Sequence, residues 1–188
     1  MPLDAGLFSF VGGDAGRWRI LSSEAVTGEG VPVAARLEIV NSGAGEAGGA
    51  EWILRGVTSN KRYVIRTGKD ALLKHPNTLD RTGAVCAALI PIRQNAARWK
   101  LTQDERQSIF EDRSSHIRTG LKYLPAVARR LYQCRDLEPS RPFDFITPFD
   151  CAPEHSAAFE QMAGELGPTE EWQFADRETD IRMEWVRA

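Results

Sequence analysis

Alternating and continuous runs of apolar residues divide the chain into a strand-rich first half and a mixed second half. The first half predicts four strands, which we expect to form two pairs, at residues 7–11, 17–21, 35–40 and 50–57. Glycine-rich segments connect the two strands of each expected pair. The near-continuous apolar run at 84–92 then predicts a central strand that is buried on both faces.

The second half contains the clearest helix pattern of the sequence. Thr102 and Glu105 have the spacing of a capping box, in which the side chain of each residue accepts a hydrogen bond from the backbone N–H of the other. An apolar stripe follows them, so the pattern predicts an amphipathic helix over about 102–119. Further helices are expected at 62–74 and at about 153–165.

Two strand-like runs, at 142–147 and 172–185, flank the last of these helices. Residues 124–134 fit two structures: a helix with Pro125 near its start, or a strand that places Arg129 on an otherwise apolar face. The local pattern does not decide between them. Together the elements predict a single α+β domain, residues 1–188, with a mostly antiparallel sheet.

Composition narrows the class of protein. Lys and Arg total 24 and Asp and Glu total 26, for a net charge of −2, which argues against a dedicated nucleic-acid-binding protein. No apolar run has the roughly 20 residues that a membrane span needs, and no secretory signal is visible at the start. The three cysteines, Cys86, Cys134 and Cys151, have no zinc-site spacing and suit a reducing compartment, so we expect a cytoplasmic protein.

Among the three histidines, His116 is distinctive because it lies on the apolar stripe of the predicted helix. His75 falls in a polar loop and His155 in a first helical turn. A histidine on an apolar face is either a hydrogen-bonded core residue or a ligand. One imidazole with open positions opposite is what a five-coordinate haem iron requires, whereas zinc needs further nitrogen or sulfur ligands.

Charged residues elsewhere are candidates to act with this histidine. A ligating imidazole usually donates its other N–H to a carboxylate, and Glu170 and Glu171, at the start of the predicted last strand, are candidates for that role. They also fit a solvated acidic turn. Arg129, on an apolar strand face, needs a carboxylate or an anion to offset its desolvation. It is therefore either part of a structural ion pair or a site for an anionic substrate.

Stretches throughout the chain together resemble the chlorite dismutase family. They are Ala88–Arg93, Leu101–Arg106, Ile109–Ile117, Leu121–Arg129, Cys134–Asp136, Pro142–Phe145, Ala152–His155, Thr169–Trp172 and Asp180–Arg182, with Phe10–Asp14, Trp18 and Leu54–Val57 before them. The likeness is closest to the short, dimeric branch of the family. It implies a ferredoxin-like antiparallel sheet with helices on one face, within the dimeric α+β barrel superfamily, and a homodimer.

The same resemblance implies how the chain is divided and what it does. Residues 1–83 would be a reduced β-rich half and 84–188 a haem-binding core, in which 124–134 is a strand. The cofactor would be haem b, with His116 as the proximal iron ligand, Glu171 as its hydrogen-bond partner and Arg129 as the distal, catalytic arginine. Apolar side chains would line the distal side, namely Ile90, Leu124 and Phe149.

The implied activity is the decomposition of chlorite to chloride and dioxygen. It would proceed by cleavage of the O–Cl bond and rebound of transient hypochlorite on ferryl haem. Arg129, which stays protonated, would hold that anion near the iron. Other haem proteins of this fold remain as alternatives: a peroxidase-like enzyme, or a haem-binding or sensing module with poor chlorite turnover. A haem-free dimer is a further alternative.

The chain departs from the family pattern at three places. Gln94 stands where a lysine usually completes the proximal network, and Arg98 where a tryptophan is usual. We hypothesise that Arg98 supplies the lost positive charge, since positions i and i+4 can share one face. Pro76 and Asn77 replace the distal glutamine of the dimeric branch, and Pro148 replaces a common aromatic residue.

Overall fold

The computed structural model describes residues 6–41, 49–58, 79, 81–137 and 140–186. The helix expected at 62–74, and with it His75, Pro76 and Asn77, lies outside the described residues.

The described strands form one antiparallel sheet that closes on itself. They are β1 (Leu7–Gly13), β2 (Trp18–Thr27), β3 (Arg36–Asn41), β4 (Ala50–Thr58), β5 (Cys86–Gln94), β6 (Val127–Arg129), β7 (Tyr132–Gln133), β8 (Phe145–Cys151) and β9 (Ala175–Trp185). Their order is β5-β9-β2-β3-β1-β4-β7-β8-β6, and an additional pairing of β5 with β8 closes the ring. The prediction of an α+β fold with an antiparallel sheet is confirmed.

The two hairpins expected in the first half are wrong. β1 lies between β3 and β4, and β2 pairs with β3 and β9. Phe10 therefore faces Ile39 on one neighbour and Leu54 on the other, and it is fully buried. A strand flanked on both sides and closed into a ring buries more apolar surface than two separate hairpins would, which favours the observed order.

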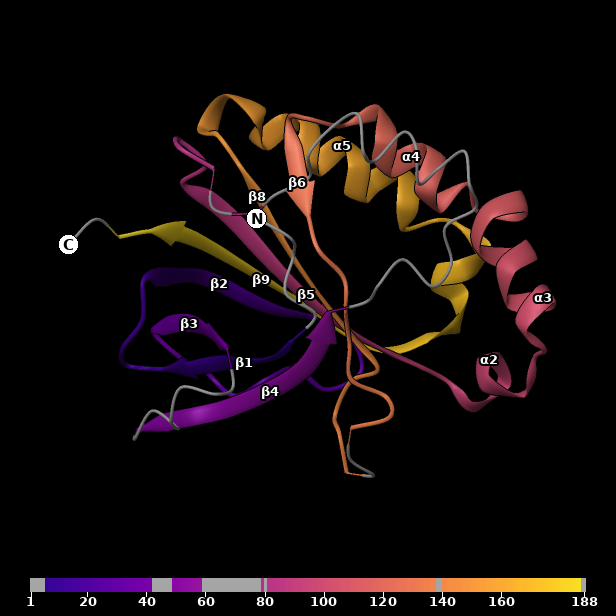
Figure 1. Ribbon diagram of the computed structural model, residues 1–188, viewed down its shortest axis with the longest axis horizontal. Helices are drawn as coiled ribbons and strands as arrows, with labels where there is room; N and C mark the ends of the chain where they lie inside the picture. The colour runs from indigo at the N-terminus through magenta and orange to yellow at the C-terminus, as the bar shows by residue number, and fades with distance from the viewer. Residues whose placement is uncertain (1–5, 42–48, 59–78, 80, 138–139, 187–188) are drawn as a thin grey trace.

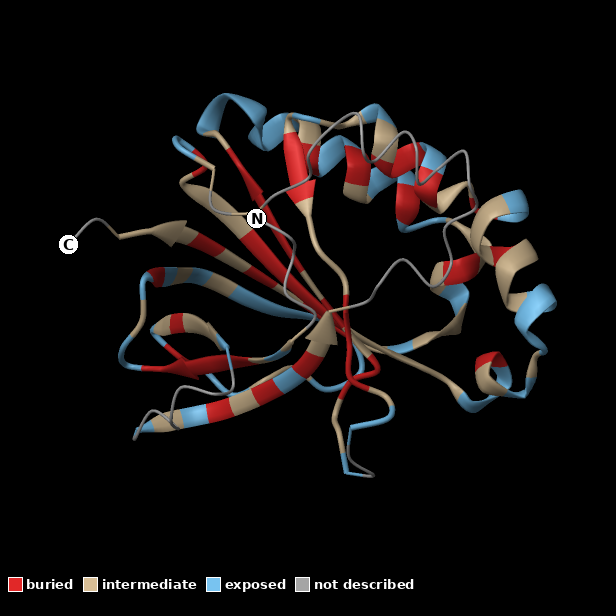
Figure 2. Ribbon diagram, in the orientation of Figure 1, coloured by how far each residue is buried: buried red, intermediate tan, exposed pale blue. Residues whose placement is uncertain are grey.

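The interior of the closed sheet is filled by apolar and aromatic side chains, which we call the interior core. Its buried members are Phe10, Trp18, Ala34, Leu37, Trp52, Leu54, Leu89, Tyr132, Cys134, Phe143, Ile146, Ile181 and Met183. Tyr132 packs edge-on against Phe8 and Phe10, with ring centroids 5.2 and 5.0 Å apart. Strands from both halves of the chain contribute to this core, and the buried segments follow the strands in Figure 2.

Helices form a second layer on the outer face of β5, β6 and β8 (Figure 1). They are α2 (Ala96–Lys100), α3 (Gln103–Gln107), the π-helix η1 (Ser108–Arg113), α4 (His116–Lys122), the 3₁₀-helices η2 (Pro153–His155) and η3 (Glu170–Phe174), and α5 (Ser156–Leu166). A second apolar group, the outer cluster, fills the space between this layer and the sheet. Its buried members are Ala88, Ile90, Val127, Phe149, Cys151, Phe159, Met162 and Leu166.

The continuous helix predicted over 102–119 is wrong in its second half, although its capping box at Thr102 and Glu105 is present. The chain passes through the π-helix η1, and Ser115 then takes a left-handed conformation with φ of 52°. A non-glycine residue with such a φ ends a regular helix. The break makes His116 the first residue of α4, which ends at Lys122.

The remaining elements follow the sequence with changed boundaries. Residues 124–134 contain the strands β6 and β7, as the resemblance implied. The helix expected at 153–165 is present as η2 followed by α5. The last strand begins at Ala175, because Trp172 donates its backbone N–H to the Thr169 carbonyl at 3.1 Å and tightens residues 170–174 into a 3₁₀-helix.

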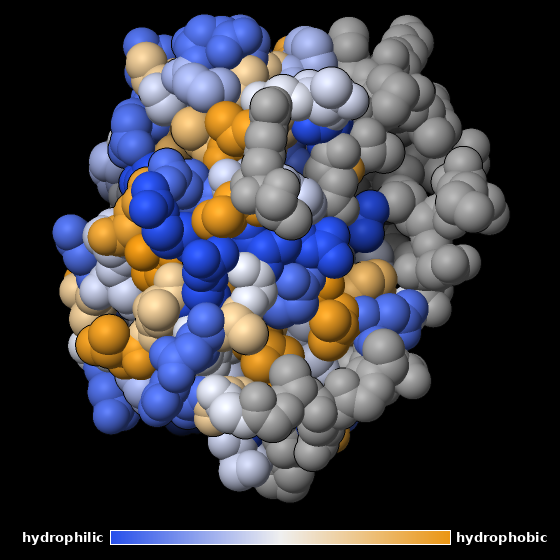
Figure 3. All heavy atoms as spheres, turned by 90° about the vertical axis from the view of Figure 1, so that its left-hand side faces the viewer, coloured by the Kyte–Doolittle hydropathy of each residue, from blue (hydrophilic) through white to orange (hydrophobic). Residues whose placement is uncertain are grey.

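On the face shown in Figure 3, hydrophilic side chains lie across the middle and apolar side chains form small separate groups. Each helix within the described part of the chain is too short or too polar to cross a membrane.

Candidate functional site

His116 and Glu171 come together within the helical layer. The Nδ1 atom of His116, at the start of α4, lies 2.8 Å from the Oε2 atom of Glu171 in η3. The two side chains are only 19 % and 10 % exposed. A carboxylate at this position accepts a hydrogen bond from the Nδ1–H group, which leaves Nε2 as the ring atom that can bind a metal.

The helix break holds this pair in place. The backbone N–H of Glu171 donates to the hydroxyl of Ser114 at 3.0 Å. On the other side of the break, the N–H of Ile117 donates to a carboxylate oxygen of Glu111, also at 3.0 Å. The irregular turn therefore connects η1, α4 and η3, and it fixes the end of α4 that carries His116.

Two aromatic rings set the plane of the imidazole. Phe110 stacks on His116 with ring centroids 4.4 Å apart and an interplanar angle of 22°, and Trp172 stacks at 5.9 Å and 13°. The indole N–H of Trp172 donates to the carboxylate of Glu178 in β9, at 3.1–3.2 Å. The imidazole is thus restrained in its plane by stacking and at one nitrogen by a carboxylate.

Glu178 is a buried carboxylate that the sequence analysis did not single out. It is 6 % exposed, and burial raises its pKa above the ordinary glutamate value, while the Trp172 hydrogen bond opposes the shift. The sequence pattern that could have identified Glu178 is the alternation of outward-facing and inward-facing residues along β9. It places Glu178 on the outer face, one position before the buried Thr179. The sequence predicts a role for Glu171 as the partner of His116 but none for the neighbouring Trp172.

The sheet contributes a second wall to the same region. Arg129 pairs with Phe149, and Phe149 pairs with Ala88 on the next strand. Directly opposite residues of antiparallel strands point to the same face. These three side chains, together with Ile90 two residues along β5, therefore lie on the outer face, toward the helices. Leu124, which was predicted beside them, is in the turn between α4 and β6 and is partly buried.

The guanidinium of Arg129 reaches from β6 across to α4. It lies against Gly120, one turn after His116, where any Cβ atom would collide with it. Burial lowers the pKa of Arg129, and the charges of Glu171 and Glu111 oppose that shift. An arginine nonetheless stays protonated at any physiological pH. The fold therefore brings together the three predicted residues His116, Glu171 and Arg129.

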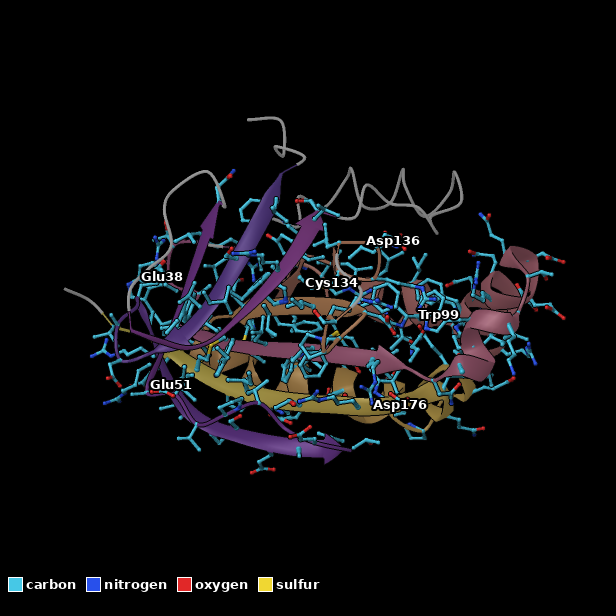
Figure 4. All side chains as sticks on the ribbon, turned by 90° about the horizontal axis from the view of Figure 1, so that it is seen from below. Glu38, Glu51, Trp99, Cys134, Asp136 and Asp176 are labelled. Atoms are coloured by element: carbon cyan, nitrogen blue, oxygen red, sulfur yellow. The ribbon has the colours of Figure 1, made fainter. Side chains whose placement is uncertain are left out.

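Gln94 is the last residue of β5, and Arg98 lies in α2. The Arg98 Nε atom donates to Oε1 of Gln94 at 3.3 Å, and its Nη2 donates to the Arg106 carbonyl at 3.3 Å. The guanidinium also lies 5.6 Å from the ring centre of Phe174, in the same 3₁₀-helix as Glu171. Trp99, next in the chain, is beside the end of β5 in Figure 4. The two departures from the family pattern thus contact each other.

The last departure falls on the other side of the sheet. Pro148 is the direct partner of Leu89, a member of the interior core. It therefore faces the interior of the closed sheet and not the helical layer.

Fold and site define an α+β protein with a closed antiparallel sheet and a carboxylate-bound histidine on its outer face. No family model and no curated protein matches the chain. Among solved structures it is similar to the dimeric chlorite dismutase from Nitrobacter winogradskyi, with 50 % identity, 95 % of this chain and 99 % of that chain covered, and a TM-score of 0.88. The chain belongs to the chlorite dismutase family.

A more distant structure shares the fold. The chlorite dismutase from Candidatus Nitrospira defluvii in complex with imidazole has 16 % identity and a TM-score of 0.66, with 96 % of this chain and 92 % of that chain covered. At this identity the likeness supports the architecture alone.

Proposed function

We propose that the protein binds haem b and decomposes chlorite to chloride and dioxygen. The hydrogen bond between His116 and Glu171 carries this proposal. It leaves the other imidazole nitrogen available to hold haem iron, in a family whose members include the dimeric chlorite dismutase of Nitrobacter winogradskyi.

The residues around His116 fit an iron porphyrin. Within the described part of the chain, no three His, Cys, Asp or Glu side chains come together as a metal site of their own. A single protein ligand suits haem, because the porphyrin supplies four nitrogen ligands itself. The adjacent outer cluster, with Ile90 and Phe149, offers apolar side chains for the macrocycle.

Arg129 is proposed to bind chlorite and to retain the hypochlorite that forms when the O–Cl bond breaks. Haem b, when bound, supplies the redox chemistry that breaks the O–Cl bond. Arg129 attracts chlorite, which is an anion, and then holds hypochlorite close until the O–O bond forms. A fixed guanidinium in a poorly solvated site does this with little reorganisation, because its charge is present before the reaction starts.

Glu171 is proposed to act through His116. By accepting a hydrogen bond from the Nδ1–H group, Glu171 increases the electron donation of the imidazole and fixes the direction of the ring. Arg98, hydrogen-bonded to Gln94, is proposed to provide the positive charge that the usual lysine would provide in this network. The contact of Arg98 with Phe174 supports this role, because it ties the guanidinium to the helix that carries Glu171.

Two features of architecture belong to the same proposal. The order β9-β5-β8-β6 in the second half supports a ferredoxin-like arrangement of the haem-binding core. The similarity to a dimeric relative supports a homodimer.

An oxygen electrode with haem-loaded protein tests the function. Addition of chlorite is expected to release one dioxygen for each chlorite consumed, without an external reductant. An absorption spectrum of the same sample verifies that haem is bound. A haem-loaded protein that oxidises a peroxidase substrate with peroxide but releases no dioxygen from chlorite would instead support the peroxidase-like alternative.

A further inference from the structure

Two of the three cysteines lie directly opposite each other in the sheet. Cys86 at the start of β5 is the register partner of Cys151 at the end of β8, and both thiols are free. Directly opposite residues of antiparallel strands have Cα atoms roughly 4.5–5.5 Å apart. That separation is within the range of about 4.4–6.8 Å that a disulfide spans. The two side chains also point to the same face, toward α5.

A small cavity gives access to this pair. Its volume is about 50 Å³, and Cys86 and Cys151 line it together with Phe149, Phe159 and Arg182 among others. Cys151 is 5 % exposed, whereas Cys86 is only partly buried. A cavity of this size holds a water molecule or another molecule of a few atoms. A small oxidant can therefore reach this pair of cysteines.

We propose that Cys86 and Cys151 form a reversible cross-strand disulfide when the protein meets a hypohalous acid. In the first step one thiol sulfur attacks the chlorine of hypochlorous acid, which gives a sulfenyl chloride and water. In the second step the other sulfur displaces chloride and releases its proton, and the S–S bond forms. The sum is two thiols and HOCl giving one disulfide, water and HCl, so two electrons pass from sulfur to chlorine.

The position of the pair connects it to the proposed site. Phe149 lines the cavity and also lies beside Arg129 on the outer face. Hypochlorite that escapes Arg129 would meet these thiols within the same layer of the molecule. This source of oxidant rests on the proposed function, whereas the ability of the pair to form a disulfide does not.

Cys134, the third cysteine, serves as an internal control, since it has no opposite cysteine. Cys134 lies among the strands in Figure 4 and belongs to the interior core, and burial raises its pKa to about 12. Burial likewise raises the pKa of Cys151, to about 11, and that of Cys86. All three are therefore thiols at neutral pH, so the opposite cysteine in the neighbouring strand, and not ionisation, is expected to separate the pair from Cys134.

The test uses the full chain without haem. The protein is treated with an equimolar amount of hypochlorite, quenched, denatured, alkylated and digested with trypsin, which places the three cysteines in different peptides. We expect one linked peptide pair containing Cys86 and Cys151, two hydrogen atoms lighter than its reduced parts and cleaved by dithiothreitol, with Cys134 alkylated. Alkylation of all three cysteines after the hypochlorite is consumed would overturn the proposal, as would separate oxidation of Cys86 and Cys151 to sulfonic acids.

Cysteine-to-serine variants distinguish a specific link between Cys86 and Cys151 from general oxidation of the protein. Cys134→Ser is expected to give the same linked peptide, whereas Cys86→Ser and Cys151→Ser are each expected to abolish it. Loss of the linked peptide in Cys134→Ser would contradict the assignment. In a parallel sample, haem-loaded protein receives chlorite alone. If that sample releases no dioxygen while added hypochlorite still links the pair, the proposed function fails and the disulfide site stands.

Discussion

The interior core and the outer face of the sheet are both closely packed, but they bury different kinds of groups. Phe10, Leu89 and Ile181 in the interior are fully buried apolar side chains. On the outer face the apolar cluster borders Glu171 and Glu178, which are buried carboxylates. Burying a charge costs free energy unless the group is paired. The comparison teaches that the interior stabilises the fold, whereas the outer face holds polar groups in positions that stability alone does not favour.

The same strands serve both regions because side chains alternate along them. In β9, Thr179, Ile181 and Met183 are buried on one face, while Glu178 and Arg182 lie on the other. A shift of one residue in register would exchange the two sets. The register of the closed sheet therefore fixes the strand residues of the candidate site, Arg129 and Glu178, together with the core.

The largest effect is expected from removal of the proposed iron ligand. His116→Ala should lose bound haem and with it the chlorite activity, because the haem supplies the redox chemistry of the proposed reaction. Absorption spectra and an oxygen electrode measure the two losses. The matched control is His155→Ala, which changes an exposed histidine and should retain both properties. Haem retention by His116→Ala equal to that of the control would contradict the assignment.

A truncation in the interior should affect stability and not the chemistry. Leu89→Ala, at a fully buried position, is expected to lower the free energy of unfolding by about 2–5 kcal/mol, because it leaves a cavity. Urea denaturation measures the change. The Leu89→Ala protein that remains folded and haem-loaded should release dioxygen at the wild-type rate per haem. A large loss of that rate in the folded variant would show that the interior core and the outer face do not act separately.

Removal of the distal cation Arg129 should slow the chemistry while haem still binds. Arg129→Ala is expected to bind haem but to release dioxygen about 10²–10³-fold more slowly, as when one preorganised electrostatic group is removed from an active site. More hypochlorite should also escape, which a chlorination-sensitive dye detects. Arg118→Ala alters an exposed arginine of α4 and serves as the control. An undiminished, durable rate in Arg129→Ala would exclude the proposed role.

The smallest effect concerns Glu178 and depends on pH. The pKa of Glu178 is raised in the folded protein, so at neutral pH folding keeps a buried carboxylate ionised at a cost that the unfolded chain does not have. Below the ordinary glutamate pKa the group is neutral in both states and the cost disappears. Glu178→Gln, whose amide oxygen can still accept from Trp172, should therefore stabilise the protein at pH 7 more than at pH 4.

Urea midpoints at the two pH values measure this difference. Glu24→Gln, at an exposed position of β2, should show no such dependence. A stabilisation by Glu178→Gln that is equal at both pH values would mean that the buried charge is not its cause.

Local patterns predicted the elements better than their arrangement. The apolar run at 84–92 and the capping box at Thr102 depend on neighbours in sequence, and both are present. The pairing of β1 with β3 and β4 depends on closure of the whole sheet, which adjacent residues do not encode. The left-handed Ser115 is also invisible in the apolar stripe, because its neighbour Ser114 is held by η3, far along the chain.

The residues of the candidate site were predictable where a polar or charged residue stood in an apolar pattern. His116 on an apolar stripe and Arg129 on an apolar strand face were both identified for that reason. Glu170 and Glu171 were both candidates for the carboxylate partner of the histidine, and the resemblance selected Glu171. Trp172 and Glu178 were not identified, because an aromatic residue and an acid in a strand-like run fit an ordinary half-buried strand. Their roles depend on the 3₁₀-helix that turns the indole onto the imidazole.

The central claim is that Glu171 holds the imidazole of His116 while its other nitrogen binds haem iron. Resonance Raman spectra of the ferrous, haem-loaded protein measure the iron–imidazole stretching frequency directly. We predict such a band in the wild-type protein and a shift to lower frequency in Glu171→Gln, because an amide at Nδ1 reduces electron donation by the ring. A wild-type spectrum without this band, or a band at the same frequency in both proteins, would contradict the account.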